Sequence, residues 1–173
     1  MSHGERPGAA IQRGFHLQNV HWLWLAAAVI VVDQVSKQLV VHYLDEFDRI
    51  VLAPVLNLVR LHNTGAAFSL LAALPPWFFV AISLVVAIGI MLWLRRHPRG
   101  ETLLAVGLSL IAGGALGNAI DRATRGFVVD FVDVHVASWH WPAFNVADSA
   151  ITVGAALLLL DMWCKRRQSP RGS

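Results

Sequence analysis

Four long apolar segments constrain the fold of this chain more than any other feature. They cover residues 21–41, 76–94, 102–120 and 147–163. A helix needs roughly 17 to 25 residues to cross the hydrocarbon of a bilayer, and each segment is that long. Only 14% of the 173 residues are charged, whereas soluble domains average about 25%. We therefore predict an α-helical polytopic membrane protein with four transmembrane helices.

The first segment differs from a cleavable signal peptide in two respects. It is longer than the apolar region of such a peptide, and it carries Asp33, Gln34 and Lys37. We therefore interpret it as an uncleaved transmembrane helix.

The basic residues predict the orientation in the membrane. Nine of the fourteen Lys and Arg residues fall on one side of a four-span topology: Arg6, Arg13, Arg95, Arg96, Arg99, Lys165, Arg166, Arg167 and Arg171. The positive-inside rule makes that side cytoplasmic, with residues 1–20 and 164–173 as cytoplasmic tails flanking a membrane domain at 21–163. The basic charge is then explained by topology and by contact with anionic membrane lipids, so we expect no nucleic-acid partner.

The two outer loops, at about 42–75 and 122–146, each contain a strand-like stretch. Residues 50–63 are rich in β-branched side chains, and residues 127–136 alternate with many valines. We predict that the two strands pair into a small extracytoplasmic β-sheet platform on the outer leaflet.

Two aspartates in the second outer loop compete for a chemical role. In a strand, Asp130 shares its face with valines, whereas Asp133 shares its face with Phe127, Phe131 and His135. A carboxylate among valines is desolvated and its pKa rises, whereas one beside a histidine is more easily neutralised. Taken singly, either one could be an ordinary loop aspartate.

Asp148 lies at the start of the fourth apolar segment. Asn145 can serve as the N-cap of that helix, which makes Asp148 its N3 residue, where a carboxylate meets the helix dipole. Capping alone would explain the residue, but capping and catalysis are compatible. If Asp130 and Asp148 meet, they can share a proton as the two carboxylates of aspartic proteases do, and we hypothesise a membrane-embedded aspartyl peptidase.

Other polar residues near the outer ends of the helices admit two interpretations. Asp33 and Lys37 are four residues apart on one helix face, which suits either a buried structural pair or a site role. Asn118, Asp121 and Arg122 end the third apolar segment, and the last two could simply form an ion pair. Gly113 and Gly117 form a small-residue face for close helix packing, and Ala150 and Gly154 form a similar one.

No metal or cofactor motif is evident. His135 and His140 are neighbours, but five residues apart in a strand they are expected to face opposite sides. The sequence has no HExxH motif and no GxSxG motif, and Ser36 diverges from Lys37 on a helix. The single cysteine, Cys164, makes no intrachain disulfide.

Taken together and in order, five motifs closely resemble lipoprotein signal peptidase, also called signal peptidase II. They are Asp33-Gln34 with Lys37, HNTGAAFS at 62–69, GGALGNAIDR at 113–122, GFVVDF at 126–131 and FNVADSAITVG at 144–154. The resemblance covers nearly all of residues 20–163. It implies a catalytic dyad of Asp130 and Asp148. It also implies supporting polar residues at Asp33, Asn63, Asn118, Arg122 and Asn145, to which we add Lys37, Gly65 and Asp121 as candidates.

The resemblance further implies the reaction and its setting. The family cleaves bacterial prolipoproteins on the N-terminal side of a cysteine that carries diacylglycerol. It uses no metal or organic cofactor and is the target of the cyclic peptide globomycin. We therefore expect a monomer in the bacterial cytoplasmic (inner) membrane, with its site near the outer leaflet.

Two other classes of function remain as alternatives. In a transporter or proton relay, Asp33, Lys37, Asp121 and Asp148 would line a path across the membrane. A relay needs polar stations through the full thickness, whereas the candidates gather in the outer half. A non-catalytic membrane assembly factor would leave the polar clusters in both outer loops unexplained.

Overall fold

The computed structural model describes residues 19–65, 74–96 and 101–168. Its helices are α1 (Leu23–Tyr43, after a short 3-10 turn at Val20–Trp22), α2 (Pro76–Arg96), α3 (Thr102–Arg125) and α4 (Val146–Gln168). All four are long and apolar enough to cross a membrane. The prediction of four transmembrane helices is therefore confirmed.

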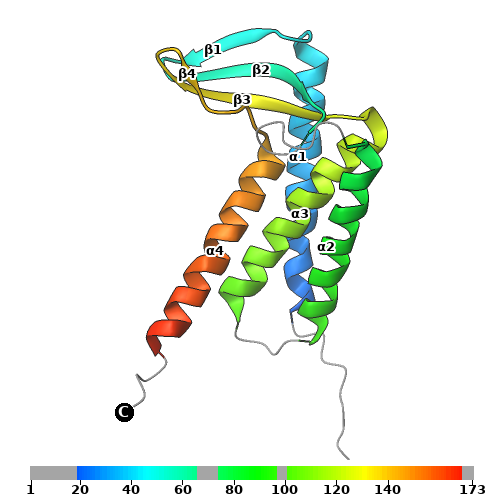
Figure 1. Cartoon of the computed structure of the whole chain (residues 1–173), viewed down its shortest axis with the longest axis vertical. Coiled ribbons are helices and arrows are strands. Elements are labelled where there is room, and N and C mark those ends of the chain that lie inside the picture. The colour runs from blue at the N-terminus through cyan, green and yellow to red at the C-terminus, as the bar shows by residue number, and fades with distance from the viewer. Residues whose placement is uncertain (1–18, 66–73, 97–100, 169–173) are drawn as a thin grey trace, which may run out of the picture.

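Helix α3 is the central element of the bundle, because it packs against α1, α2 and α4 (Figure 1). Glycines permit these close approaches. A Cβ on Gly114 would lie 2.3 Å from the carbonyl oxygen of Ala147 in α4, and a Cβ on Gly113 would lie 2.8 Å from that of Ala26 in α1. The predicted packing face at Gly113 is thus used against α1, whereas Gly114 forms the contact with α4.

All four helices end later than the predicted segments, and α3 and α4 exceed them most. Helix α3 continues to Arg125 and ends at Gly126, whose φ of 82° is left-handed and whose N–H bonds the carbonyl of Arg122. Residues 122–125 therefore belong to the helix, and our prediction that they begin the outer loop was wrong. Helix α4 runs to Gln168, so the first part of the predicted tail at 164–173 is helical. In both cases polar residues continue the helix after the apolar run has ended.

The sheet has four antiparallel strands in the order β1-β2-β3-β4. The strands are β1 (Arg49–Ala53), β2 (Leu56–Asn63), β3 (Val128–Val136) and β4 (Trp139–His140). The expected single strand at 50–63 is in fact a hairpin, because the chain turns at 54–55, where proline cannot donate to a ladder. The predicted pairing between the two outer loops is confirmed, with Leu61 opposite Asp130 in the register of β2 and β3.

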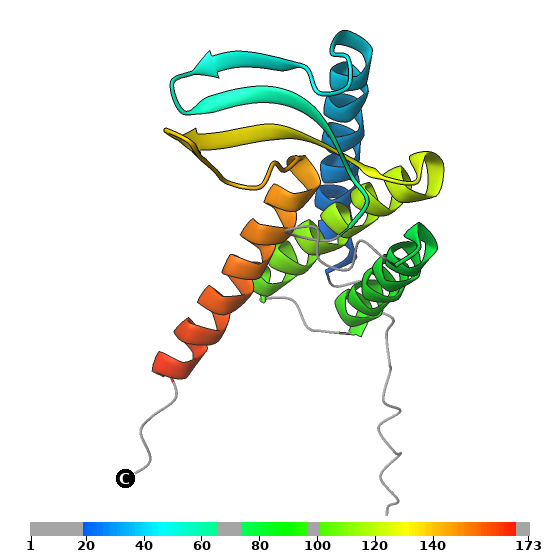
Figure 2. The ribbon, with the colours of Figure 1, turned by 45° about the horizontal axis from the view of Figure 1, so that its top comes forward.

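The sheet lies across one end of the helix bundle, above the start of α4 and beside the end of α1 (Figures 1 and 2). Val40 of α1 packs with Val129 and Phe131 of β3 in a buried cluster. Arg60 of β2 ties the sheet to the end of α1, because its guanidinium donates to the carbonyl of Leu44 at 2.9 Å. Strand β3 is thereby held next to the first turn of α4.

Candidate active site

Asp130 lies near the start of β3 and is only 3% exposed. Its two carboxylate oxygens each accept a hydrogen bond from an asparagine amide. Asn145 donates to Oδ1 at 2.7 Å, and Asn63 at the end of β2 donates to Oδ2 at 2.9 Å. The carboxylate is therefore buried yet held in a defined orientation by two neutral donors.

Asp148 lies in the first turn of α4 and forms a reciprocal cap with Asn145. The backbone N–H of Asp148 donates to Oδ1 of Asn145 at 2.9 Å, and the backbone N–H of Asn145 donates to Oδ2 of Asp148 at 3.3 Å. This is the capping arrangement that satisfies two free N–H groups at a helix start. The predicted N-cap at Asn145 is confirmed. Asn118 of α3 adds a bond to Oδ1 of Asp148 at 2.8 Å.

Asn145 joins the two carboxylates. Its side-chain Nδ2 donates to Asp130, and its backbone N–H donates to Asp148. Burial, and next the nearby charge of Asp148, raise the pKa of Asp130 to about 7, against the lowering effect of the hydrogen bonds from Asn63 and Asn145. A carboxyl group with such a pKa can hold a proton near neutrality beside a second carboxylate.

Asp133, the rival of Asp130, has a different environment. It accepts a bond from Nδ2 of Asn57 at 2.7 Å and lies 2.7 Å from Nδ1 of His140. Burial alone would raise its pKa, but Asn57 and His140 together lower it below its ordinary value. The expected histidine neighbour exists, although it is His140 and not His135. Asp133 is therefore a paired structural carboxylate.

The two histidines occupy one face of the sheet, which contradicts our prediction of opposite faces. His135 and His140 are partners in the β3–β4 hairpin, and their rings stack at 4.9 Å. The sequence argument failed because it assumed one continuous strand. Within the described residues, no group of three metal-ligating side chains is found.

A buried ionic cluster lies directly behind the dyad. The Nζ of Lys37 is 2.8 Å from Oδ2 of Asp33, 3.0 Å from Oδ2 of Asp121 and 2.9 Å from Oδ1 of Asn118. Lys37, Asp33 and Asp121 are completely buried. The predicted Asp33–Lys37 pair is confirmed. The suggested Asp121–Arg122 pair is wrong, since Asp121 pairs with Lys37 and Arg125.

Lys37 determines which end of the Asn118 amide faces Asp148. An ammonium group only donates hydrogen bonds, so the atom of Asn118 that it contacts must be the oxygen. The Nδ2 of Asn118 is then directed to Asp148, where a donor can stabilise the ionised carboxylate. The positive charge of Lys37 thus affects Asp148 indirectly, by fixing the orientation of the neutral Asn118 amide.

Arg122, Gly65 and Asn63 also meet beside the dyad. The guanidinium of Arg122 donates to the carbonyl of Gly65 at 2.5 Å and lies 4.7 Å above the ring of Phe79 in α2. The backbone N–H of Gly65 donates to Oδ1 of Asn63 at 3.0 Å, which directs the Asn63 amide nitrogen to Asp130. Residues 66–69 of the HNTGAAFS motif lie outside the described residues.

Gln34, which we had noted only as part of a motif, and Arg125, which we had not noted, complete the cluster. Gln34 donates from Nε2 to the carbonyl of Gly117 at 3.1 Å and to Oδ1 of Asp121 at 3.2 Å. Arg125 pairs with Asp121 four residues earlier in α3. This spacing would have predicted the pair if we had extended the third helix to residue 125. Asp33 has a second role, because its Oδ1 accepts the backbone N–H of Ala147 at the start of α4.

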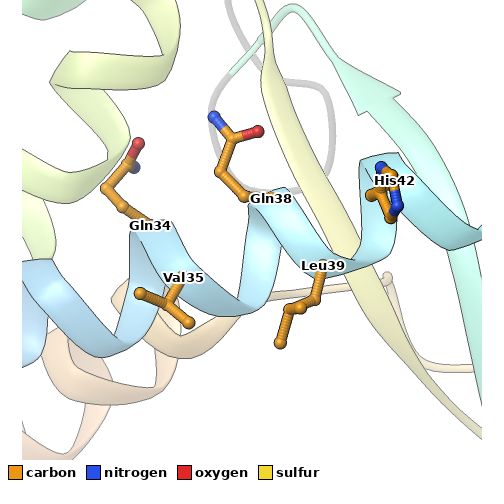
Figure 3. Close-up of a pocket in the computed structure, with 5 residues that line it drawn as sticks. All are labelled: Gln34, Val35, Gln38, Leu39 and His42. Carbon is orange, nitrogen blue, oxygen red and sulfur yellow. The ribbon is translucent and has the colours of Figure 1, made fainter.

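A separate groove of about 500 Å³ runs along α1. Its lining consists of Gln34, Val35, Gln38, Leu39 and His42, with Gln34 and Gln38 pointing to one side of the helix and Val35 and Leu39 to the other (Figure 3). Among these, Gln34 alone contacts the buried cluster. The groove itself contains no carboxylate.

The fold and the site together define a class: a multi-pass membrane protein with two carboxylates joined at one end of its helix bundle. The chain belongs to the signal peptidase (SPase) II family, whose model matches residues 25–164. It is 51% identical over 144 residues to a lipoprotein signal peptidase of Coxiella burnetii, covering 82% of this chain and 88% of that protein. It is 43% identical over 173 residues to one of Acinetobacter baumannii, covering 96% of this chain and 98% of that protein.

Two solved structures, each described as a bacterial membrane enzyme determined by the in meso method, share the fold. The first has a TM-score of 0.80 and 29% identity, and the match covers 89% of this chain and 94% of that chain. The second has a TM-score of 0.73 and 31% identity, with 83% and 92% covered. The family model and the curated relatives confirm the resemblance noted in the sequence, and the solved structures confirm the fold.

Proposed function

We propose that this chain removes the signal peptide of bacterial prolipoproteins, cutting on the N-terminal side of a cysteine that carries diacylglycerol, with Asp130 and Asp148 as its catalytic dyad. Membership of the signal peptidase II family supports the reaction class. The observation that carries the assignment of the dyad is Asn145, which contacts one carboxylate through its side chain and the other through its backbone.

The two carboxylates are suited to opposite roles. Asp148, at the helix N-terminus and bonded by Asn118, is the ionised member that removes a proton from water. Asp130, whose pKa is raised to about 7, holds the proton and donates it to the scissile carbonyl oxygen. The water oxygen bonds to the carbonyl carbon and gives a tetrahedral gem-diol. When the C–N bond breaks, the proton acquired by Asp148 passes to the leaving amine, and a hydroxyl of the gem-diol returns its proton to Asp130 as the C=O bond of the new carboxyl group forms.

The surrounding residues hold this pair and the substrate. Asn63, Asn118 and Asn145 orient the carboxylates through their amides. Arg122 and Gly65 lie beside them, where a guanidinium and backbone groups can bind the substrate backbone. Lys37, Asp33 and Asp121 support Asn118 from behind. The chemistry of this set requires neither a metal nor an organic cofactor.

The position of the dyad at the sheet end of the helices suits a lipid-anchored substrate. Acyl chains and a signal helix would lie in the hydrocarbon, and the scissile bond would reach the dyad at the membrane surface. With both termini cytoplasmic by the distribution of basic residues, this surface is the outer face of the inner membrane. We expect the enzyme to act as a monomer and to be inhibited by globomycin-type peptides that compete for the same site.

The transporter or proton-relay alternative has no support from the comparisons. Within the described residues, the fully buried charged side chains are Asp33 and Lys37, in the middle and the second half of α1, and Asp121, near the end of α3. They form a closed cluster with one another and with Arg125. A relay would instead need such groups at successive depths.

The test is cleavage of a diacylglyceryl-modified prolipoprotein by purified protein in detergent or nanodiscs, followed by mass spectrometry. The product should lose the mass of the signal peptide. Asp130→Asn and Asp148→Asn should each abolish this loss, whereas Asp133→Asn, on the same strand, should retain substantial activity. An unlipidated precursor should be cleaved far more slowly, since remote binding energy positions the scissile bond. Equal cleavage of both precursors, or an inactive Asp133→Asn variant beside an active Asp130→Asn variant, would contradict the proposal.

A further inference from the structure

Asn63, which donates a hydrogen bond to Asp130, is the last residue of β2. In the ladder it pairs with Val128, the first residue of β3, and the chain leaves the sheet after Asn63. The bond from the N–H of Gly65 orients the Asn63 amide, but it comes from outside the sheet. The ends of structural elements open more readily than their interiors. The position of Asn63 against Asp130 therefore depends on how the end of β2 is held.

His62, the preceding residue, lies on the opposite face of β2, because successive side chains of a strand alternate. Asn63 is on the face of Asp130, to which it donates. The register partner of His62 is Val129, and Val129 packs with Val40 of α1 in a buried cluster. The face that carries His62 is thus the one that contacts α1, and it is turned away from the dyad.

Two contacts hold the imidazole of His62 on this face. Its ring stacks on that of Phe127, with the centroids 3.8 Å apart and the planes at 24°. Its Nδ1 lies 2.9 Å from Oε1 of Glu46 in the loop after α1. Phe127 directly follows Gly126, where α3 ends, and it packs against the buried cluster of Val129. His62 thereby joins the end of β2 to the junction between α3 and β3.

The stacked ring is the stronger of these two contacts. The side chain of Glu46 is 45% exposed, whereas that of His62 is 19% exposed. A pair with such an exposed partner contributes little, because water competes for both groups. A stacked aromatic pair is stabilised by the apolar area that it removes from water as well as by its ring geometry. The flat ring, more than the bond to Glu46, therefore fixes β2 at residue 62.

We propose that His62 is a positioning residue of this site: its ring, stacked on Phe127, holds the end of β2 so that the amide of Asn63 stays on Asp130. The connection is one peptide unit long, with His62 against the α3–β3 junction on one face and Asn63 against the dyad on the other. The consequence for catalysis rests on the proposed function. The contact between Asn63 and Asp130 can also be followed without catalysis.

Substitutions at residue 62 separate the ring from its other properties. His62→Thr removes the ring and keeps a β-branched side chain that suits a strand, and His62→Ala is a second variant without a ring. His62→Phe keeps a flat ring but removes both the titrating group and the bond to Glu46. Val59→Ala is the matched control for general weakening of the fold, because Val59 is 4% exposed in the same strand and lies four residues before Asn63.

The first measurement is the pH profile of kcat/KM with the diacylglyceryl-modified precursor. Burial raises the pKa of Asp130 and the bond from Asn63 opposes this rise, so loss of the bond should move the descending limb to higher pH. We expect a shift on the order of 0.5 to 1 pH unit for His62→Thr and His62→Ala, which corresponds to one hydrogen bond of ordinary strength. His62→Phe and Val59→Ala should keep the wild-type limb. An unmoved limb in both variants without a ring, or an equal shift in either of the other two, would overturn the inference.

A double variant tests whether His62 acts through Asn63. Asn63→Ala alone should move the descending limb in the same direction as His62→Thr. Adding His62→Thr to Asn63→Ala should then move it no further, because the bond on which His62 acts is already absent. A further shift in the double variant would show that His62 acts by another route and would contradict the positioning role.

Thermal melting distinguishes failure of this inference from failure of the proposed function. In any background, the melting temperature of Asp130→Asn minus that of its Asp130 counterpart levels off at the pH where Asp130 ionises. This pH should rise with His62→Thr, by the same amount as the limb, and should not change with His62→Phe. A wild type that cleaves no prolipoprotein would refute the proposed function alone. A levelling pH that is equal in all three backgrounds would overturn the role of His62 whether or not the chain is active.

Discussion

Replacing Asp130 with asparagine should make the protein increasingly stable relative to the wild type as the pH rises, because the wild type loses stability, even though the variant is expected to be inactive. In the folded wild type, the pKa of Asp130 is raised to about 7, chiefly by burial and then by Asp148. In the unfolded chain the same group ionises near its ordinary value of 3.8. Between these values unfolding releases a proton, so rising pH favours the unfolded chain.

The magnitude follows from the two pKa values. A tenfold change in proton affinity is worth about 1.4 kcal/mol. The stabilisation associated with protonated Asp130 is complete below the unfolded-state pKa and is lost as the pH approaches 7. The total loss is about 4 kcal/mol, and because the carboxyl is 3% exposed, solvent screening reduces it little. Asparagine does not titrate, so the variant keeps a constant contribution over this range.

The assay is thermal unfolding in detergent, followed by tryptophan fluorescence between pH 4 and 8. The melting temperature of Asp130→Asn minus that of wild type should increase by on the order of 10 °C across this range and level off above pH 7. Asp133→Asn is the matched control, because the pKa of Asp133 is lowered and its contribution is lost only at more acidic pH. A difference for Asp130→Asn that stays constant with pH would refute the argument, whatever its absolute value.

Three further predictions follow from the site and the bundle. The pH profile of kcat/KM should be bell-shaped, with its descending limb near pH 7, where the protonated carboxyl of Asp130 ionises. A profile that stays high to pH 9 would contradict this prediction, as would activity that a chelator removes and zinc restores. Lys37→Met should reduce kcat on the order of 100-fold, because the Asn118 amide loses the contact that orients it. Lys165→Met, which breaks an exposed ion pair, should leave kcat unchanged. Equal activities of the two variants would contradict a role of Lys37 in orienting Asn118. Gly114→Ala should destabilise the protein by about 1–3 kcal/mol, because its Cβ meets the α4 backbone at 2.3 Å, and Gly89→Ala, with nothing within 4 Å, should be neutral in the same melting experiment.

The helices, the outer strands and the cap of α4 could be predicted because each depends on local sequence. Apolar length determines the spans, and the Asn145 to Asp148 spacing determines the cap. Alternation also separated Asp130 from Asp133, since one carboxylate is buried between neutral amides and the other has a histidine partner. These properties require knowledge of one segment at a time.

The errors concern contacts between segments. The hairpin turn at 54–55 and the β3–β4 turn reverse the chain, and His135 and His140 become partners only after that reversal. Similarly, hydropathy ended the third helix at 120, but the helix continues because Asp121 is neutralised by Lys37 from α1 and by Arg125 one turn later. A charged residue that looks like a helix end in the sequence can be an interior residue when a partner from another helix neutralises it.

Asp130 and Asp148 differ in their tendency to hold a proton because they receive different kinds of hydrogen-bond donor. Asp130 receives both of its amide donors from side chains, Asn63 and Asn145, which remain neutral, so burial prevails and the proton is retained. Asp148 receives a backbone N–H at a helix start as well as the Asn118 amide, and these two hydrogen bonds favour its charged form. Because Asn145 belongs to both sets, any displacement of the sheet relative to α4 alters both carboxylates together.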